Sequence, residues 1–504
     1  MIRRSLYSLL LILFLSTSLY GQSDSVEKIK ELVPQSDVEM KIYFLAADEF
    51  KGRDTGSPHI DIAGRYIATW FMTNGIKPLP GHDNYYQPIP FNQMRVPEDG
   101  TVTLGDLSYS YGSEFIILNT PRGEFEGPIT VLEHGIGEEL DDADVEGKIV
   151  VVRPGAEGQV NPQQWFMSAS QKNQALQEMG ALAVVELYDN QQLPWQVLVN
   201  FLNQDRLEIA DEEEELESEE DIPHIWINSS TEDLHSIIAE MSGADGSISV
   251  TGAPAERVYS NNVIGYIEGT NPDLRDEYLM LGAHYDHVGI DESREGNYIY
   301  NGARDNAVGT AGIMLAARYL AQNPPERSVI FAAWTAEEMG LLGSGYFADN
   351  PMVPLDQIVY KLNIDGAGYN DTTKVMVIGL ERTEAADDLK SAAEAFGLEA
   401  IPDPVPEQNL FNRSDNASFA RKGIPAPTYS LGMTDFDEEI NRYYHTVEDE
   451  PHTLDYPYIT RYLRSFLLAA EKIANAPVAP FWSDGDPFKQ LGLELYGREV
   501  EVER

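Results

Sequence analysis

Short apolar runs alternate with longer helical patterns in the second half of the chain. From residue 261 to about residue 476, runs of strand length alternate with stretches that have apolar residues at helical spacing. The pattern predicts strands at 261–268, 278–283, 327–334, 357–364, 374–379 and 426–431, and helices at 307–322, 341–349, 384–396 and 458–474. Such alternation is typical of an α/β fold with a mostly parallel sheet flanked by helices.

The first half of the chain has a different pattern. Helical spacing runs from residue 25 to residue 74, and short β-like runs then follow between about residues 94 and 254. Because helical segments stand on both sides of this β-rich module, we interpret it as an insertion into a single α/β domain. The predicted parts are a leader at 1–21, the start of the α/β domain at 22–93, the inserted domain at 94–254, the rest of the α/β domain at 255–479 and a C-terminal tail at 480–504.

The N-terminus has the pattern of a secretory signal peptide. Arg3 and Arg4 precede an apolar run at 6–20, and small or polar residues follow around Gly21. The alternative is a membrane anchor, but a bilayer span needs about 20 apolar residues. We therefore predict a secreted or periplasmic protein with no stable membrane insertion after cleavage at residue 21.

Composition and charge narrow the possible partners and ligands. The chain has 504 residues and no cysteine, so any metal must be bound by nitrogen and oxygen. Its formal net charge of -48 argues against nucleic acid as a partner, because phosphate binding needs clustered Lys and Arg. The acidic run at 211–221 is interpreted as a solvated, flexible segment, with a calcium site or a partner-binding loop as alternatives.

Imidazole and carboxylate side chains follow the predicted strands, at the edge where open α/β sheets bind ligands. They are His284, Asp286, Asp305, Glu337, Glu338, Asp365 and His445. Each has an ordinary alternative role, such as a helix cap, a turn or a helix N-terminus. His287 and His452 are interpreted as surface or helix-capping histidines. The conjunction of the seven at successive strand ends nevertheless favours a metal site.

The residue types fit a site for two metal ions. Two ions about 3.5–4 Å apart need one bridging carboxylate, with a histidine and a further carboxylate for each. That count is met by His284, Asp305, Glu338, Asp365 and His445. Since neighbouring residues point in different directions, Glu337 can serve as general base while Glu338 binds metal. Asp286 can orient the His284 imidazole.

These segments resemble the M28 family of co-catalytic zinc aminopeptidases. The resemblance covers about residues 262–474, and its most specific motifs are 282–286, 302–309, 336–344, 363–366 and 443–446. Segments 414–419 and 423–426 are also similar to the family. The β-rich module resembles a protease-associated (PA) domain, most clearly at 144–152.

The resemblance implies a zinc-exopeptidase fold and a role for each residue. His284 and Asp365 would bind one zinc, Glu338 and His445 the other, and Asp305 would bridge the two ions. Glu337 would act as general base on a water between the ions, and Asp286 would support His284. Tyr444 would help to stabilise the oxyanion. The implied function is a secreted aminopeptidase that hydrolyses the N-terminal bonds of peptides or proteins.

Three alternatives remain open. Family members commonly have an acidic or neutral residue where Arg304 stands. Arg304 would either pair with an acidic neighbour or bind a substrate carboxylate. If it binds a substrate carboxylate, the enzyme could be a carboxypeptidase or dipeptidase. An enzyme that cyclises N-terminal glutamine would use one zinc and need no bridging set. A non-catalytic, receptor-like binding protein on the same fold would have lost ligands, but all five and the base are present. The sequence leaves the oligomeric state open.

Overall fold

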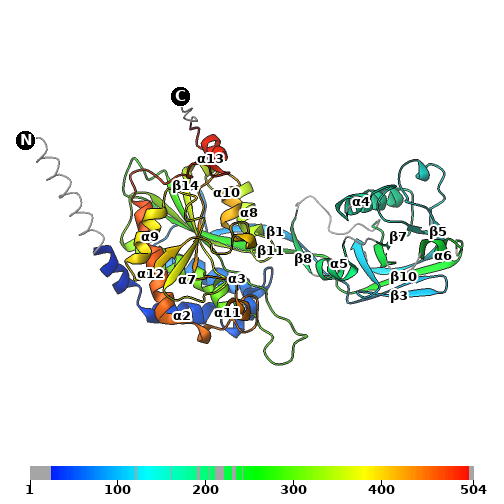
Figure 1. Ribbon diagram of the computed structural model, residues 1–504, viewed down its shortest axis with the longest axis horizontal. Coiled ribbons are helices and arrows are strands. Elements are labelled where there is room, and N and C mark those ends of the chain that lie inside the picture. The colour runs from blue at the N-terminus through cyan, green and yellow to red at the C-terminus, as the bar shows by residue number, and fades with distance from the viewer. Residues whose placement is uncertain are drawn as a thin grey trace, which may run out of the picture. The chain divides into compact units, whose positions relative to one another are not determined.

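The computed structural model describes residues 24–119, 122–159, 162–189, 193–203, 205–210, 221–229, 234–240 and 242–498. The chain forms two compact units, one of residues 1–89 and 259–504 and the other of residues 90–258 (Figure 1). The unit boundaries lie four residues from each of the predicted limits 94 and 254. The predicted signal peptide and nearly all of the acidic run lie outside the described residues.

The first unit is built on a mixed sheet with a parallel centre. The strand order is β16-β15-β17-β14-β12-β13-β11-β1-β8. Strand β8, and the part of β1 with which it pairs, belong to the second unit. The strands are β1 (Tyr86–Met94), β11 (Glu256–Ile267), β12 (Tyr278–His284), β13 (Ser328–Trp334), β14 (Ile358–Ile364), β15 (Lys374–Ile378), β16 (Glu399–Ile401) and β17 (Thr428–Leu431). Strand β12 pairs in parallel with both β13 and β14, and β14 pairs in parallel with β17. The predicted α/β class is confirmed.

Helices cover both faces of this sheet. They are α2 (Gln35–Leu45), α3 (Pro58–Thr73), α7 (Val308–Gln322), α8 (Leu342–Asp349), α9 (Ala386–Glu394), α10 (Asn416–Ala420), α11 (Glu438–Tyr443), α12 (Tyr456–Ala474) and α13 (Lys489–Leu495). Alternate residues of β12 point to opposite faces, as a strand requires: Leu279 and Leu281 join the core under α7 and α12, and Met280 joins the core under α8 and α10. A buried strand with apolar residues on both faces reads as a continuous apolar run.

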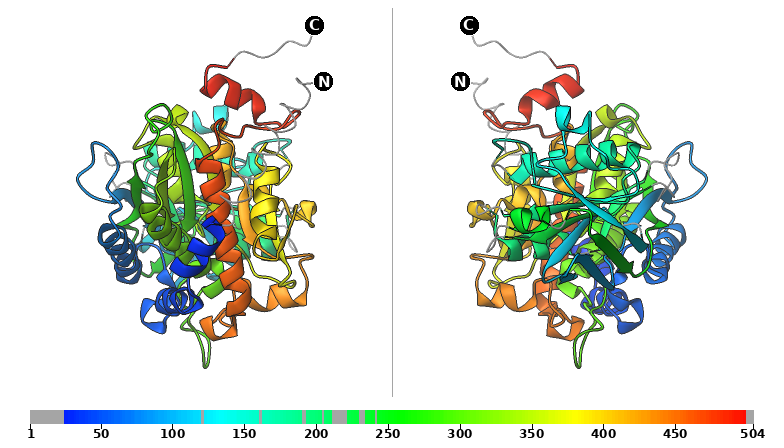
Figure 2. Two further views of the ribbon diagram at one scale, coloured as in Figure 1. Left: turned by 90° about the vertical axis from the view of Figure 1, so that its left-hand side faces the viewer. Right: turned by 90° about the vertical axis from the view of Figure 1, so that its right-hand side faces the viewer.

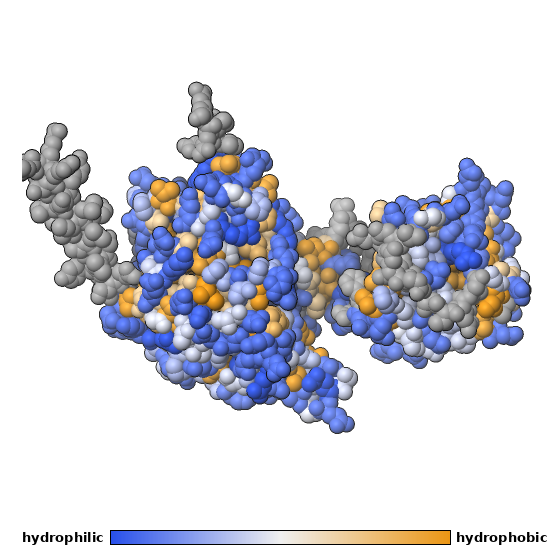
Figure 3. All heavy atoms as spheres, viewed as in Figure 1, coloured by the Kyte–Doolittle hydropathy of each residue, from blue (hydrophilic) through white to orange (hydrophobic). Residues whose placement is uncertain are grey.

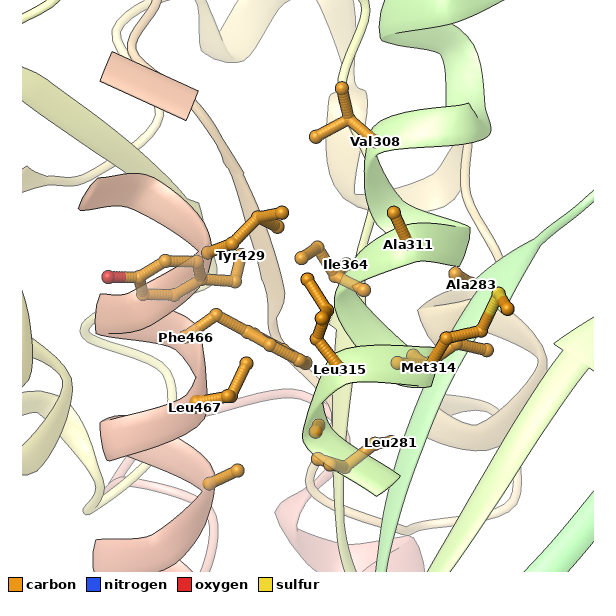
Figure 4. Packing of buried hydrophobic residues seen from close by; sticks show 14 of the residues in the cluster. Leu281, Ala283, Val308, Ala311, Met314, Leu315, Ile364, Tyr429, Phe466 and Leu467 are labelled. Atoms are coloured by element: carbon orange, nitrogen blue, oxygen red, sulfur yellow. The ribbon is translucent and has the colours of Figure 1, made fainter. Parts of the chain in front are cut away.

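Helix α12 is a main part of the layer that covers the same face of the sheet as α7. Asp455 accepts a hydrogen bond from the Tyr458 amide, and a proline stands in the first turn, so the helix start is fixed locally. Along the helix, Phe466 and Leu467 pack toward α7 and the sheet (Figure 4). Among the N-terminal helices, blue in the left view of Figure 2, α2 contacts α12.

The second unit has a sheet of its own, in the order β3-β2-β10-β5-β6-β7-β9-β4. Its strands are β2 (Asp99–Leu104), β3 (Leu107–Ser110), β4 (Phe115–Asn119), β5 (Gly123–Val131), β6 (Ile149–Val152), β7 (Ala183–Tyr188), β9 (His224–Asn228) and β10 (Asp245–Thr251), with β8 (Arg206–Ile209) paired to β1. Its helices are α4 (Pro162–Glu178), α5 (Trp195–Leu202) and α6 (Leu234–Ala239). The unit is β-rich, as expected.

The face shown in Figure 3 is mainly hydrophilic, with apolar residues in separate groups. Among the described helices, none combines the length and the apolar character that crossing a membrane requires.

Replacing Leu467 by Ala should lower the stability of the first unit by about 2–5 kcal/mol, because its side chain is fully buried between α12 and the sheet. Leu491→Ala on α13 is the matched control, since that side chain is 41% exposed. Thermal unfolding of both variants measures the difference. Equal melting temperatures would contradict the packing described for α12.

Candidate metal centre

The predicted site residues meet at the carboxyl edge of the parallel strands. His284 is the last residue of β12, and Asp365 directly follows β14. Glu337 and Glu338 lie in the turn after β13, and Asp305 lies just before α7. His445 follows α11 with a positive φ of 52°. Segments up to 161 residues apart in the chain therefore converge through the parallel strand arrangement.

Asp305 lies between the two histidines. Its Oδ1 is 3.1 Å from His284 Nε2, and its Oδ2 is 3.2 Å from His445 Nε2. One carboxylate thus presents one oxygen to each imidazole. This is the arrangement that a carboxylate bridging two cations requires.

Each histidine also faces a second carboxylate. His284 Nε2 is 3.2 Å from Asp365 Oδ1, and His445 Nε2 is 3.0 Å from Glu338 Oε2. The site therefore has two halves that share Asp305, each with one imidazole and one further carboxylate. The structure brings together all five residues predicted as ligands.

The second carboxylate oxygens of Asp365 and Glu338, which do not face the histidines of the two halves, have hydrogen-bond partners of their own. Ser414 Oγ donates to Asp365 Oδ2 at 2.5 Å, and Asn363 Nδ2 donates to Ser414 Oγ at 2.8 Å. On the other side, His287 Nδ1 lies 2.6 Å from Glu338 Oε1. These contacts fix which oxygen of each carboxylate faces the centre. Sequence reasoning missed Ser414 as a partner of Asp365, although it falls in a segment that carried the family resemblance.

Asp286 lies beside His284 and also contacts the turn after β13. Its carboxylate lies 3.7 Å from His284 Nδ1, and its backbone carbonyl lies 3.3 Å from the same nitrogen. The two carboxylate oxygens also accept the backbone N–H groups of Glu337 and Glu338, each at 3.2 Å. Asp286 therefore holds the turn that carries both glutamates.

Glu337 lies close enough to His284 and Asp365 to be a ligand by distance alone. It is 8% exposed, and burial together with nearby Asp365 and Asp415 raises its pKa well above the ordinary value. A carboxylate with a raised pKa takes up a proton readily, as a general base must. Glu338 lies beside His445, whereas Glu337 lies beside His284 and Asp365.

The electrostatics of the site are those of converging carboxylates. Burial acts to lower the pKa of His445, but Asp305 and Glu338 outweigh it and raise the pKa to about 10. Burial and Asp305 act to raise the pKa of Glu338, yet His287 and His445 lower it to about 2. For His284, the carboxylates Glu337 and Asp365 overcome burial and raise the pKa well above its ordinary value. The site thus attracts positive charge.

This donor set fits zinc. Two imidazole nitrogens and several carboxylate oxygens converge, and the chain has no thiol to compete with them. Zinc accepts this combination and leaves a position for water or substrate. Divalent cations would also neutralise the carboxylates that converge here.

Arg53 joins the segments that carry the ligands, a role that no sequence motif predicted. Its buried guanidinium donates to the carbonyls of Tyr285, Asn301 and Gly302 at 2.6 to 2.9 Å. These carbonyls flank His284 on one side and precede Asp305 on the other. One side chain from the N-terminal segment therefore holds the two loops in register.

Two predictions about single residues are settled by burial. His287 is 1% exposed and contacts Glu338, so its interpretation as a surface or capping histidine is wrong. The reason is that it follows β12 into the buried edge of the sheet. His452 has a 69% exposed side chain, as expected of a surface histidine.

Arg304 pairs with an acidic neighbour, the first of its two expected roles. Its guanidinium donates to Asp449 at 3.0 Å and to Thr453 Oγ1 at 2.7 Å, and it stacks on the Tyr443 ring at 3.6 Å. It is 3% exposed, so it is not available to bind a substrate carboxylate.

A pocket opens beside the candidate metal centre. Besides the site carboxylates and His445, its described lining includes Arg413 and Tyr444, whose hydroxyl accepts from the Arg413 guanidinium at 3.1 Å. The Tyr444 ring stacks on His445 at 4.0 Å, and burial raises the pKa of its hydroxyl. The apolar part of the lining is formed by Met376, Ile378, Leu410, Met433 and Phe436. Sequence reasoning missed this pocket, because its residues come from separate segments.

Comparison with known proteins agrees with this geometry. Residues 262–470 match the sequence model of Peptidase family M28. This part of the chain is therefore similar to peptidase family M28. Aminopeptidase YwaD of Bacillus subtilis (strain 168) is 27% identical over 198 residues, which cover 38% of this chain and 39% of that protein. A vacuolar membrane protease of Kluyveromyces lactis is 33% identical over 109 residues, covering 22% of this chain and 10% of that protein.

The M28 resemblance predicted from the sequence is thus confirmed. The matched stretches span well under half the length of these relatives. Among solved structures, the aminopeptidase from Aneurinibacillus sp. strain AM-1 is similar with a TM-score of 0.55 at 20% identity. The similarity covers 90% of this chain and 97% of that one, and it shows a shared fold.

Replacing Asp305 by Ala should remove both metal ions, because its two oxygens face both histidines, whereas Asp365→Ala should remove one. Elemental analysis after dialysis, with about two zinc per chain expected for the unchanged protein, makes the comparison. Asp273→Ala, which alters an exposed aspartate, is the control and should keep both ions. Equal metal loss in the Asp305 and Asp365 variants would contradict the bridging role.

Proposed function

We propose that the protein is a zinc aminopeptidase that hydrolyses the N-terminal bonds of peptides or proteins with two zinc ions per chain. The observation that carries the proposal is the Asp305 carboxylate, with one oxygen toward each histidine and a further carboxylate beside each. His284 and Asp365 would hold one ion, Glu338 and His445 the other, and Asp305 would bridge them.

The chain's own residues would carry the proton transfers. When bound, zinc supplies Lewis acidity that activates a water and polarises the scissile carbonyl. Glu337 accepts the proton of the attacking water and passes it to the leaving amine. Asp286 holds the Glu337 amide, so the base stays aimed at the centre. Tyr444 stands beside His445, where its hydroxyl can donate to the oxygen of the tetrahedral intermediate.

Action at the amino end is favoured by the charges of the site. An α-ammonium group is attracted by buried carboxylates such as Glu337 and Asp365, which would repel a substrate carboxylate. Arg304 is engaged with Asp449 and offers no carboxylate site. Arg413, exposed at the pocket, is the remaining feature that would suit a dipeptide's carboxylate. Release of amino acids from dipeptides but not from longer peptides would favour that alternative.

Glu337→Gln should lower kcat by at least about 10²-fold, because the amide cannot accept the water proton. Metal content should stay unchanged, since Glu337 is not assigned as a ligand. Hydrolysis of a leucyl reporter and elemental analysis are measured on the same preparation. Full activity in this variant would remove Glu337 from its role, and loss of zinc would make it a ligand.

The pocket beside the centre suits an apolar side chain at the substrate's N-terminus. Met376, Met433 and Phe436 lie in its lining with Ile378 and Leu410. Burying a charged side chain among such groups is costly unless it is paired. Methionines also adapt to apolar side chains of different shape.

Leucyl and methionyl reporters should therefore have kcat/KM at least about 10-fold above glutamyl and lysyl reporters, a difference of about 1.4 kcal/mol in transition-state binding. Met433→Lys should reduce the difference in kcat/KM between leucyl and glutamyl reporters, because it places a cation in the pocket. Met72→Lys on α3, where the side chain is 61% exposed, is the control. An unchanged ratio in Met433→Lys would show that the side chain binds elsewhere.

Secretion and the assignment of the second unit complete the proposal. The N-terminal pattern at 1–21 supports export, and the β-rich unit at 90–258 supports an inserted PA-like domain. Mass spectrometry of the exported protein tests the first point, because cleavage after residue 21 gives a defined N-terminus.

A further inference from the structure

His287 has one polar contact at the centre, and it is directed at a proposed ligand. Its Nδ1 lies 2.6 Å from Glu338 Oε1, while Glu338 Oε2 lies 3.0 Å from His445 Nε2. An ionised carboxylate only accepts hydrogen bonds, so Nδ1 must carry the hydrogen. The two oxygens of Glu338 therefore have different tasks.

The His287 ring is held in place by its surroundings. It is 1% exposed, and a Cβ at Gly302 would come within 2.6 Å of its Cγ and Cδ2. Gly302 has a φ of 59°, a conformation that favours glycine. The loop leading to Asp305 thus lies directly on the ring, which prevents the imidazole from turning away from Glu338.

The other nitrogen of the His287 ring does not compete with this hydrogen bond. Nε2 is buried, and no hydrogen-bond partner for it occurs among the described residues. If the ring served only to fill space, an apolar side chain would leave no such buried polar atom. The hydrogen bond to Glu338 is the feature that distinguishes a histidine here.

We propose that His287 is a positioning residue that holds Glu338 Oε1, so that Oε2 alone is presented to the metal ion shared with His445. This rests on the proposed function, because it assumes a metal at that half of the site. A fixed carboxylate loses less rotational freedom on binding the ion and keeps one coordination mode. The corresponding support on the other half is Ser414, which holds Asp365.

Binding of a metal ion in the half of the site with Glu338 and His445 depends more strongly on a fixed carboxylate than binding in the other half. His445 has a 37% exposed side chain, whereas His284, in the other half, has a 1% exposed one. A partly exposed ligand can move away from the ion, so the ion at this half relies on a fixed Glu338. Loss of the His287 donor should weaken this ion and leave the other in place.

His287→Asn and His287→Leu form a matched pair of variants. The Asn amide nitrogen is attached to Cγ, as Nδ1 is in histidine, so it can still donate to Glu338. Leu has nearly the same shape as Asn but no donor. The metal-free forms of the full chain are titrated with zinc in the presence of a competing chelator, and kcat and KM are then measured on a leucyl reporter.

We expect the Leu variant to bind the second zinc, the ion held by Glu338 and His445, about 10- to 100-fold more weakly than the unchanged protein. Its affinity for the first zinc, held by His284 and Asp365, should be unchanged. The Asn variant should stay within about threefold of the unchanged protein. The Leu variant should also lose kcat at low zinc and recover it at high zinc, with KM little changed.

Three results would overturn the proposal. Unchanged affinity for the second zinc in the Leu variant would remove the positioning role, and equal weakening in both variants would make His287 a packing residue. An unchanged protein that binds fewer than two zinc ions would overturn the two-metal proposal and this inference with it. If the Leu variant does not fold, the Asn variant still decides, because weak binding of the second zinc there contradicts a role carried by the donor.

Discussion

The concentration of buried carboxylates at one edge of the sheet is the constraint on which the rest of the site depends. Two like charges about 4 Å apart repel each other by about 4 kcal/mol at the effective dielectric of a protein surface, and more when buried. Asp305 can stay between Glu338 and Asp365 only if positive charge or hydrogen-bond donors face it. The two histidines supply part of this compensation, and divalent cations would supply the rest.

The fold meets this constraint by placing each donor from a different strand end. Parallel pairing of β12 with β13 and β14 brings His284, Glu338 and Asp365 to one edge. The backbone amides of Glu337 and Glu338 point at Asp286, so a further buried carboxylate is satisfied without any cation. Arg53 then joins the carbonyls before Asp305 to the end of β12. Asp286 and Arg53 thus each connect segments that carry the site residues.

Much of the fold and of the candidate ligand set could be predicted from the sequence, for a local reason. Strands such as β12 and β13 are continuous apolar runs, and their polar ends mark the binding edge. The partners of the ligands could not be predicted in the same way. Ser414 is 49 residues from Asp365, and His287 is 51 residues from Glu338, so no local spacing connects them. His287 was misjudged because a lone histidine after a strand looks the same whether it is exposed or buried.

Arg304 illustrates how a departure from the family pattern can strengthen the same site. Asp449 accepts the backbone N–H groups of both Arg304 and Asp305, at 2.8 and 3.2 Å, as well as the Arg304 guanidinium. Arg304 also stacks on Tyr443, two residues before His445. The loop that carries Asp305 is thus joined to the segment that carries His445, and these are the two residues that must approach each other for a shared cation. A buried ion pair is stabilising only with good geometry and further hydrogen bonds, and Arg304 has both. Its position is therefore better explained by the geometry of the metal centre than by recognition of substrate.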